Sequence, residues 1–370
     1  MTKKSLVTVV TANQLMADTI ARAIGANNLH SGYYLGNGYA VTWTNGEVIE
    51  AEYKNDEPFI MASNQDMRQM YAHHFTFKMR NYDALLGWEK SKQDAAQLNT
   101  IKALWAKSEK VVNAMEPTFD GELAFLNLYW YLRQPTTVVR AWMPRLRKMA
   151  IIHKIANGLR NPEKHEKWLA EQLVNHFIET DCAAKGMVDD DLPATEIVDT
   201  TDSNTTTLDE HTEIHIVENQ PLYNMVSLWV DATAELGYEF EQTFVIAHQL
   251  YAKSLISYPY TYQNGVPDTV TREVERDMRV LALNTKHGYL AQNIKHVSRR
   301  NNFRHGECGY NGHGIVTTGL HPVGLSSDEE KLYNLIVKRV IEAFTPTPDE
   351  VAVKKKKYRK NHFRKGAANA

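Results

Sequence analysis

Apolar residues in the first part of the chain follow two patterns, which are short continuous runs and stripes at helical spacing. The predicted strands are LVTVV (6–10), AVTW (40–43), KVVNA (110–114) and TTVVR (136–140). The predicted helices are 14–24, which Gly25 can end, about 95–108, and about 120–133. The polar stretch 50–70 is predicted to be a loop. Strands that alternate with helices predict an open, mainly parallel sheet of the α/β class.

The rest of the chain changes in character twice. Residues 144–178 have a polar helical pattern, and residues 181–213 are acidic and rich in Thr, which predicts an exposed linker. Helical periodicity returns over 221–285 and again over 329–344. The last of these helices has one apolar face, made of Leu332, Leu335, Ile336, Val340 and Phe344. An α/β domain followed by a mostly helical domain is therefore the predicted organisation.

Composition narrows the class of protein. With 370 residues, 43% of them hydrophobic and 23% charged, the chain is long enough for two or three soluble domains. No apolar run approaches the ~18–20 residues of a membrane helix, so no membrane partner is expected. The two cysteines, Cys182 and Cys308, are too few for a disulfide framework or a zinc site. These features predict a cytoplasmic location.

Charge is distributed unevenly along the chain. The net charge is −2, yet residues 354–370 hold eight Lys or Arg and no acid, which leaves −10 for residues 1–353. A terminal block of this kind is typical of disordered segments that bind polyanions. The candidate DNA-binding residues in this tail are Lys354, Lys355, Lys356, Lys357, Arg359 and Lys360. The alternative is a tail that only increases solubility.

Three carboxylates follow a predicted strand in NAMEPTFDGELAF (113–125). They are Glu116, Asp120 and Glu122, and they lie where a strand ends and a helix begins. Oxygen ligands at that edge of an α/β sheet can hold Mg²⁺, so all three are candidate metal ligands. The alternative is an ordinary helix N-terminus. A capping residue there bonds to the free amides, and the helix dipole favours acidic side chains.

The first half of the chain resembles the Toprim domain of type IA DNA topoisomerases. VVTANQLMADTIARAIGA (9–26) is similar to the family's VVAEKPSMADTIARAIGA, and NAMEPTFDGEL is similar to ATDPDREGEL. The resemblance implies a Toprim (Rossmann-like) fold and a Mg²⁺ cofactor. Two of the departures from the family pattern remove an acidic group. Ala12 replaces the glutamate that protonates the leaving oxygen, and Thr118 replaces the middle acidic residue, so only weak Mg²⁺ binding is expected.

The second half resembles the tyrosine-bearing domain of the same family. SLISYPYTYQ (254–263) is similar to the segment around the nucleophile, whose pattern is close to TYPRTDS. The resemblance implies that Tyr258 attacks a DNA phosphodiester. Tyr260 stands where the family has arginine, and Gly312 where it has histidine, with His313 one residue away. Arg140, in the matching RAW motif, and His313 are candidate DNA-binding residues.

The resemblance, the composition and the charge pattern together predict five segments. They are a Toprim-like α/β domain (1–145), a helical connector (146–180), an acidic flexible linker (181–218), a mostly α-helical topoisomerase IA-type domain with the tyrosine (219–346), and a basic disordered tail (347–370). The family builds a ring from four domains, so another polypeptide is a candidate source of missing domains.

The implied function is that of a type IA topoisomerase-like protein that binds single-stranded DNA. Cleavage through Tyr258 is expected to be impaired, because loss of one such catalytic group costs ~10²–10⁴ in rate. Two alternatives stay open. One is an active minimal DNA-cleaving enzyme with a rearranged metal site, and the other is a non-catalytic structural or regulatory subunit of a nucleoprotein complex.

Overall fold

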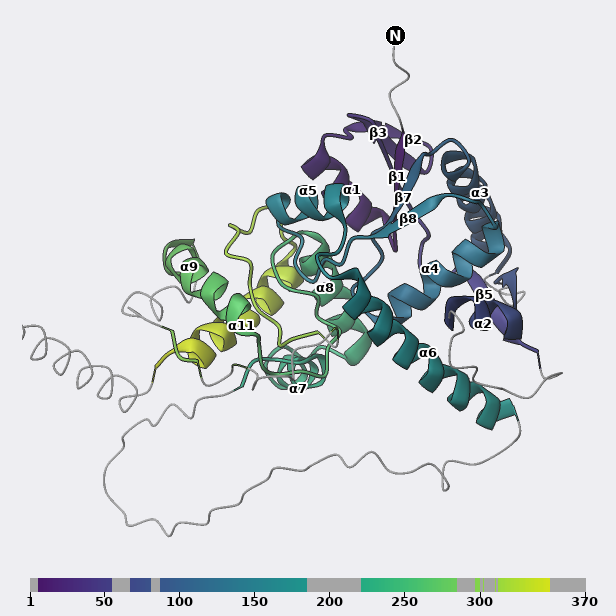
Figure 1. The fold of residues 1–370 in the computed structure, drawn as a ribbon. Coiled ribbons are helices and arrows are strands. Elements are labelled where there is room, and N and C mark those ends of the chain that lie inside the picture. Colours follow the sequence, from purple (N-terminus) through teal and green to yellow (C-terminus); the bar gives the residue numbers. More distant parts are fainter. Residues whose placement is uncertain are drawn as a thin grey trace, which may run out of the picture.

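A six-stranded mixed sheet forms the centre of the first half of the molecule (Figure 1). The structure is a computed structural model that describes residues 6–54, 67–80, 87–184, 221–284, 297–299, 302, 310 and 312–346. In this sheet the strand order is β2-β3-β4-β1-β7-β8. The strands are β1 (Val7–Thr11), β2 (Asn28–His30), β3 (Tyr33–Gly36), β4 (Tyr39–Trp43), β7 (Lys110–Asn113) and β8 (Thr137–Arg140).

The central strand β1 is parallel to both of its neighbours, β4 and β7, and β7 is parallel to β8. The strands β2 and β3 add an antiparallel edge beside β4. The chain thus leaves β1 toward one side of the sheet and later returns to the other side at β7. Ligands of open α/β sheets bind where the strand order reverses in this way, at the carboxyl ends of the strands.

Helices cover both faces of the sheet, and ten are described (Figure 1). They are α1 (Gln14–Ile24), α2 (Met67–His74), α3 (Gly87–Trp105), α4 (Phe119–Leu132), α5 (Lys148–Asn157), α6 (Pro162–Ala184), α7 (Met225–Leu236), α8 (Phe240–Ala252), α9 (Asp268–Asn284) and α11 (Ser327–Phe344). The prediction of an α/β part followed by a helical part is confirmed at this level. Among the described residues, no helix has the length and apolar character needed to cross a membrane.

Alternation along the strands divides the core between the two faces. Val9 and Val112 pack with α1 and α5, whereas Val10 and Val111 pack with α3 and α4. This follows from the period of two along a strand, which sends adjacent side chains to opposite faces. The cluster on the α1 side is continuous with the buried residues of α8 and α11. The α/β part and the helical part therefore share one hydrophobic core.

Helix ends follow the local sequence. Asn13 caps α1 by accepting a hydrogen bond from the Met16 amide at 2.9 Å, and Gly25 ends the helix with φ +82°. Ser326 and Glu329 form a capping box at the start of α11. The five residues predicted to form the apolar face of this last helix are all buried, so that prediction is confirmed.

Two predictions of secondary structure need correction. The stretch 50–70, predicted as a loop, contains most of β5 (Ile49–Tyr53), which pairs with β6 (Phe75–Met79), and the beginning of α2. The loop prediction was wrong because it rested on the charged residues of this stretch. In the structure Glu50 and Glu52 lie on one face of the strand and pair with Lys78 across the ribbon. The helical periodicity over 221–285 is also interrupted, since the segment between α8 and α9 is irregular.

Several predictions fall outside the described residues. They concern most of the acidic linker and the whole basic tail with Lys354, Lys355, Lys356, Lys357, Arg359 and Lys360.

Candidate functional site at the tyrosine pocket

Tyr258 lies in the irregular segment after α8, and contacts from both halves of the chain hold it in place. Its backbone amide donates a hydrogen bond to the Pro144 carbonyl at 2.8 Å. The neighbouring Ser257 makes two hydrogen bonds with Val316. The Ser257 amide donates to the Val316 carbonyl at 2.8 Å, and the Val316 amide donates to the Ser257 hydroxyl at 3.0 Å. These bonds fix the backbone at the tyrosine and at the residue before it, so the fold limits the direction of its ring.

The hydroxyl of Tyr258 donates a hydrogen bond to Oε2 of Glu116 at 3.0 Å. The two residues are 142 positions apart in the sequence. Burial, the charge of Glu116 and this hydrogen bond all raise the pKa of Tyr258 above its ordinary value. The phenol is consequently protonated at neutral pH, and Glu116 is placed to accept its proton.

His248 completes a row with these two groups. Its Nε2 lies 3.8 Å from Oε1 of Glu116, and its ring meets the ring of Tyr258 edge to face at 5.4 Å between centroids. Its Nδ1 lies 3.1 Å from the carbonyl of Phe244. The sequence does not indicate a role for His248, because nothing in α8 indicates which of its faces meets the carboxylate.

The turn that carries Glu116 depends on a close backbone approach. The carbonyl oxygen of Glu116 would lie 2.3 Å from a Cβ built on Gly121, so only glycine fits at that position. Thr118 caps α4 by accepting a hydrogen bond from the Gly121 amide at 3.1 Å. Asp120 and Glu122 stand in the first turn of α4, as the capping alternative predicts.

The three predicted metal ligands do not come together. Glu116 faces Tyr258 and Asp120 faces the cavity beside it, while Glu122 is buried on the other side of α4 and pairs with Arg140. No group of three or more His, Cys, Asp or Glu side chains suited to a metal ion occurs among the described residues. With Thr118 occupied as a helix cap, the turn does not fit a preformed Mg²⁺ site.

Arg140, predicted to contact DNA, has an internal role in the structure. It is 7% exposed, and it bonds to Glu122 and to the carbonyls of Asn113, Met115, Glu116 and Ala141. Burial favours the neutral form of Glu122, but Arg140 and a contact from His165 more than offset this, so the pKa of Glu122 is lowered. The pair therefore holds the turn that presents Glu116.

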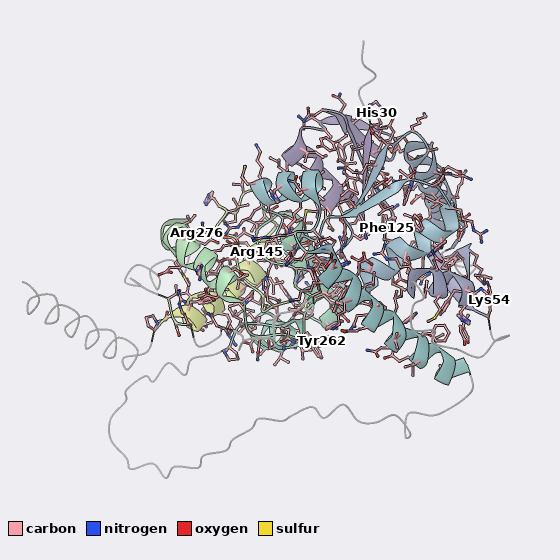
Figure 2. All side chains as sticks on the ribbon, in the orientation of Figure 1. His30, Lys54, Phe125, Arg145, Tyr262 and Arg276 are labelled. Atoms are coloured by element: carbon pink, nitrogen blue, oxygen red, sulfur yellow. The ribbon has the colours of Figure 1, made fainter. Side chains whose placement is uncertain are left out.

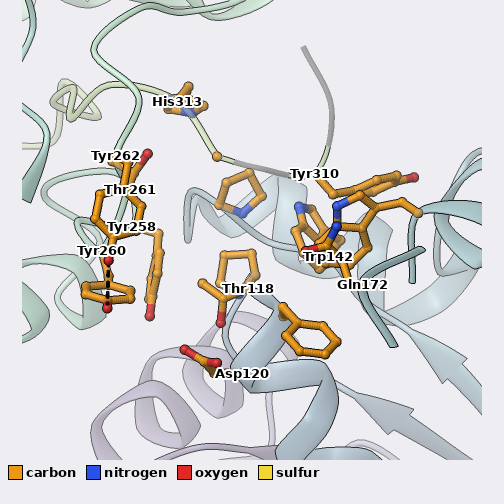
Figure 3. Close-up of a pocket in the computed structure, with 15 residues that line it drawn as sticks. Thr118, Asp120, Trp142, Gln172, Tyr258, Tyr260, Thr261, Tyr262, Tyr310 and His313 are labelled. Carbon is orange, nitrogen blue, oxygen red and sulfur yellow. Dashed lines mark hydrogen bonds between the residues drawn. The ribbon is translucent and has the colours of Figure 1, made fainter. Parts of the chain in front are cut away.

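A cavity of about 250 Å³ opens beside Tyr258 (Figure 3). Its walls are mainly aromatic. Tyr260 and Tyr262 stand on the same side as Tyr258, with their hydroxyls 3.3 Å apart, and Trp142 and Tyr310 stand opposite them. Trp168 of α6 contacts both Trp142 and Tyr310 edge-on or tilted, at 5.4 and 5.3 Å between centroids. The sequence does not indicate this aromatic wall, because its members lie far apart in the chain.

His313 lines the same cavity and is 8% exposed. Burial, helped by the charge of Arg145, lowers its pKa to about 4 against the contrary effect of its bond to Gly314. Its Nδ1 lies 2.8 Å from the carbonyl of Gly314 and so must donate there, which leaves Nε2 as an acceptor. That nitrogen is buried and has no hydrogen-bond partner within the described structure.

Positive charge is absent from the described lining of the cavity, where Asp120 is the one charged side chain. The nearby cations point elsewhere. Arg145 and Arg147 both pair with Asp277 of α9 and bond to the carbonyls of Thr317 and Thr318, respectively. Figure 2 shows Arg145 beside α9. The two arginines join α9 to the rest of the helical part and leave two carboxylates, Glu116 and Asp120, beside Tyr258.

Comparisons with known proteins identify the family. The sequence model of the DNA topoisomerase family matches residues 162–365, which is more than half of the chain. DNA topoisomerase 1 of Alkalihalophilus pseudofirmus is 29% identical over 146 residues, or 39% of this chain and 20% of that protein. DNA topoisomerase 1 of Methanothermobacter thermautotrophicus is 29% identical over 127 residues, or 33% of this chain and 16% of that protein.

Full-length topoisomerase I from Thermotoga maritima aligns in structure with 91% of this chain and 60% of its own, at 14% identity and a TM-score of 0.49. The matched stretches thus span a fifth or less of the curated relatives. With a family match over more than half of its length, the chain belongs to the type IA DNA topoisomerase family.

Proposed function

We propose that this protein binds single-stranded DNA at the Tyr258 cavity, between a Toprim-type domain and the tyrosine-bearing helical part, and that cleavage through Tyr258 is impaired. The observation that supports this most strongly is the charge around the tyrosine. Its hydroxyl donates to Glu116, Asp120 lies beside it, and the described lining of the cavity has no Lys or Arg. A phosphodiester that enters there meets repulsion in place of stabilisation.

The aromatic walls favour unpaired bases as the ligand. Exposed rings such as Tyr262 and the half-exposed ring of Tyr260 can stack on a nucleobase, and stacking of this kind is worth about 1–3 kcal/mol per base. Bases inside a duplex do not expose their faces.

The chemistry of strand cleavage shows which groups this site lacks. Tyr258 would attack phosphorus, its proton would pass to Glu116, and the bond to the 3′-oxygen would break. The leaving oxygen then needs a proton, and Ala12 stands where the resemblance places the acid. Tyr260 likewise replaces the arginine that would face the phosphate. With one ligand replaced by Thr118, we propose that Mg²⁺ binds only weakly, through Glu116 and Asp120.

A second function has one observation in its favour. Glu116 is within hydrogen-bond distance of the Tyr258 hydroxyl, so a proton acceptor for the nucleophile is present. An active minimal enzyme would use this pair. The third possibility, a purely structural subunit, requires neither the pair nor the cavity.

Covalent trapping separates these functions. The full chain is incubated with a labelled single-stranded oligonucleotide, with and without Mg²⁺, and then denatured. We expect adduct to form at least about a hundredfold more slowly than in a type IA enzyme that has the arginine. Any adduct should disappear in Tyr258→Phe and persist in the matched control Tyr260→Phe.

Rapid adduct formation by the unaltered chain would establish the active enzyme and contradict impairment. Adduct that survives Tyr258→Phe would remove this residue from the mechanism. Failure of the full chain to bind the oligonucleotide at all would overturn DNA binding and favour the structural subunit.

A further inference from the structure

The helical hairpin of α7 and α8 presents an apolar surface to solvent. Five of its side chains are large, hydrophobic and at least about a third exposed, and we call them the hairpin face. They are Val226 (46% exposed), Trp229 (36%), Val230 (54%), Phe240 (43%) and Val245 (47%). The rings of Trp229 and Phe240 meet edge to face at 5.4 Å between centroids, which joins the two helices into one surface. Contiguous exposed apolar surface of this kind marks an interaction site.

The same hairpin is acidic. Residues 221–252 contain four acids, Asp231, Glu235, Glu239 and Glu241, and no Lys or Arg. Asp231 pairs with Arg339 at 2.6 Å, whereas Glu239 and Glu241 are exposed and form no ion pair with another described residue. Such a surface repels nucleic acid. Its complement is a segment that combines cations with apolar rings.

We propose that the hairpin face binds the basic segment of this same chain, residues 354–365. That segment has eight Lys or Arg in twelve positions, and Tyr358 and Phe363 are spaced among them. The cations match the exposed glutamates of the hairpin, and the two rings match the apolar side chains of the hairpin face. This docking does not depend on the proposed DNA binding, although DNA phosphates would compete for the same cations.

The basic segment begins close enough to reach. Nζ of Lys338 on α11 lies 4.0 Å from Oε1 of Glu235, and α11 ends six residues later at Phe344. Six helical residues advance ~9 Å. From Pro346 to Lys354, eight residues span up to ~28 Å when extended. The first lysines can therefore lie over Glu235, Glu239 and Glu241 without any movement of α11.

Docking at this surface would adjoin the tyrosine pocket. A series of ring contacts runs inward from Phe240 to Phe244 (6.1 Å between centroids), from Phe244 to His248 (4.3 Å), and from His248 to Tyr258 (5.4 Å). Phe244 also meets Tyr260 at 5.8 Å. A ligand on the hairpin face and a ligand in the pocket would therefore each contact a ring of the same packed series.

Zero-length carbodiimide cross-linking of the full chain without DNA tests the docking, because it joins carboxylates to lysines in contact. We expect Glu235, Glu239 and Glu241 to cross-link within one molecule to Lys354–Lys357 and Lys360. The yield should exceed that at the exposed acids Glu163 and Glu171 of α6 by roughly tenfold. The tether raises the local concentration of the lysines at both places, but only docking holds them against the hairpin. Peptide mapping by mass spectrometry gives both yields.

Two variants separate a specific contact from general attraction. Tyr358→Ser with Phe363→Ser keeps all eight cations, and Val226→Ser with Val230→Ser keeps every glutamate. Each should lower cross-linking at the hairpin about threefold or more and leave the α6 yield unchanged. Leu29→Ser, at another exposed apolar position, should change nothing. Equal yields at hairpin and α6, cross-links only between molecules, or insensitivity to both double variants would overturn the proposal.

Discussion

The carboxylates of residues 116–122, in the turn before α4 and in its first turn, lie in two opposite environments. On one side Glu122 is buried against Arg140, and its charge is fully matched. On the other side Glu116 and Asp120 face the tyrosine pocket, where the described lining offers no cation. The difference teaches that a short acidic motif can serve structure and site chemistry at once. Residues brought in from elsewhere in the chain decide which carboxylate does which.

The largest effect is expected from Glu122→Gln. This change leaves the guanidinium of Arg140 buried without its counter-charge, and breaking a buried pair in this way costs ~3–5 kcal/mol. Urea denaturation at pH 7 measures the loss. Asp120→Asn, in the same turn but exposed, is the control and should stay within about 0.5 kcal/mol of the parent. Equal losses in both variants would show that the two sides do not differ.

His313 provides the next test, through pH. Its pKa in the folded protein is about 4, below the ordinary value of 6.5, so the folded state binds fewer protons than the unfolded state. The stability that this provides is present above pH 6.5 and is lost as the pH falls toward 4, by up to about 3 kcal/mol.

His313→Gln should remove that part of the acid sensitivity. Denaturation curves at pH 7 and pH 4 give the difference, and His321→Gln, at an exposed position, is the control. If the parent and His313→Gln lose the same stability between the two pH values, the pocket does not hold a neutral histidine.

A pocket whose described lining has no cations requires that attraction to phosphate come from elsewhere, and the tail is our candidate. Replacement of Lys354, Lys355, Lys356 and Lys357 by Gln should flatten the log–log dependence of single-stranded DNA affinity on salt by up to about 3, at ~0.7 per contact. Arg at the same four positions is the matched control and should keep the slope. An unchanged slope in the Gln variant would place the phosphate contacts outside the tail.

The smallest effect, and the most direct on the site, is expected from Tyr260→Arg. It places a guanidinium next to the phosphate position and opposes the charges of Glu116 and Asp120. Covalent adduct formation should rise on the order of tenfold. Tyr260→Gln, which lacks the charge, should not raise it. No gain with arginine would mean that charge at this position does not limit cleavage.

Local sequence determined most of the regular structure. The strand runs, the cap at Gly25 and the apolar face of α11 depend on neighbours within a few positions, and each was predictable. The ribbon of β5 and β6 was not predictable in this way. The charged residues on one of its faces are typical of a loop, and its other face packs on a core formed by α6 and α4. The family and the tyrosine were indicated by motifs, which carry order along the chain but no contacts.

By itself the sequence determined an α/β part, a helical part and the positions of Tyr258 and the three carboxylates. Tertiary structure alone decided that Glu116 meets Tyr258, that Glu122 meets Arg140, and that His313 is buried with one nitrogen that bonds to no described residue. The reason is that Coulomb energy and desolvation depend on distances and burial between residues far apart in the chain. Spacing along a motif fixes neither of these quantities.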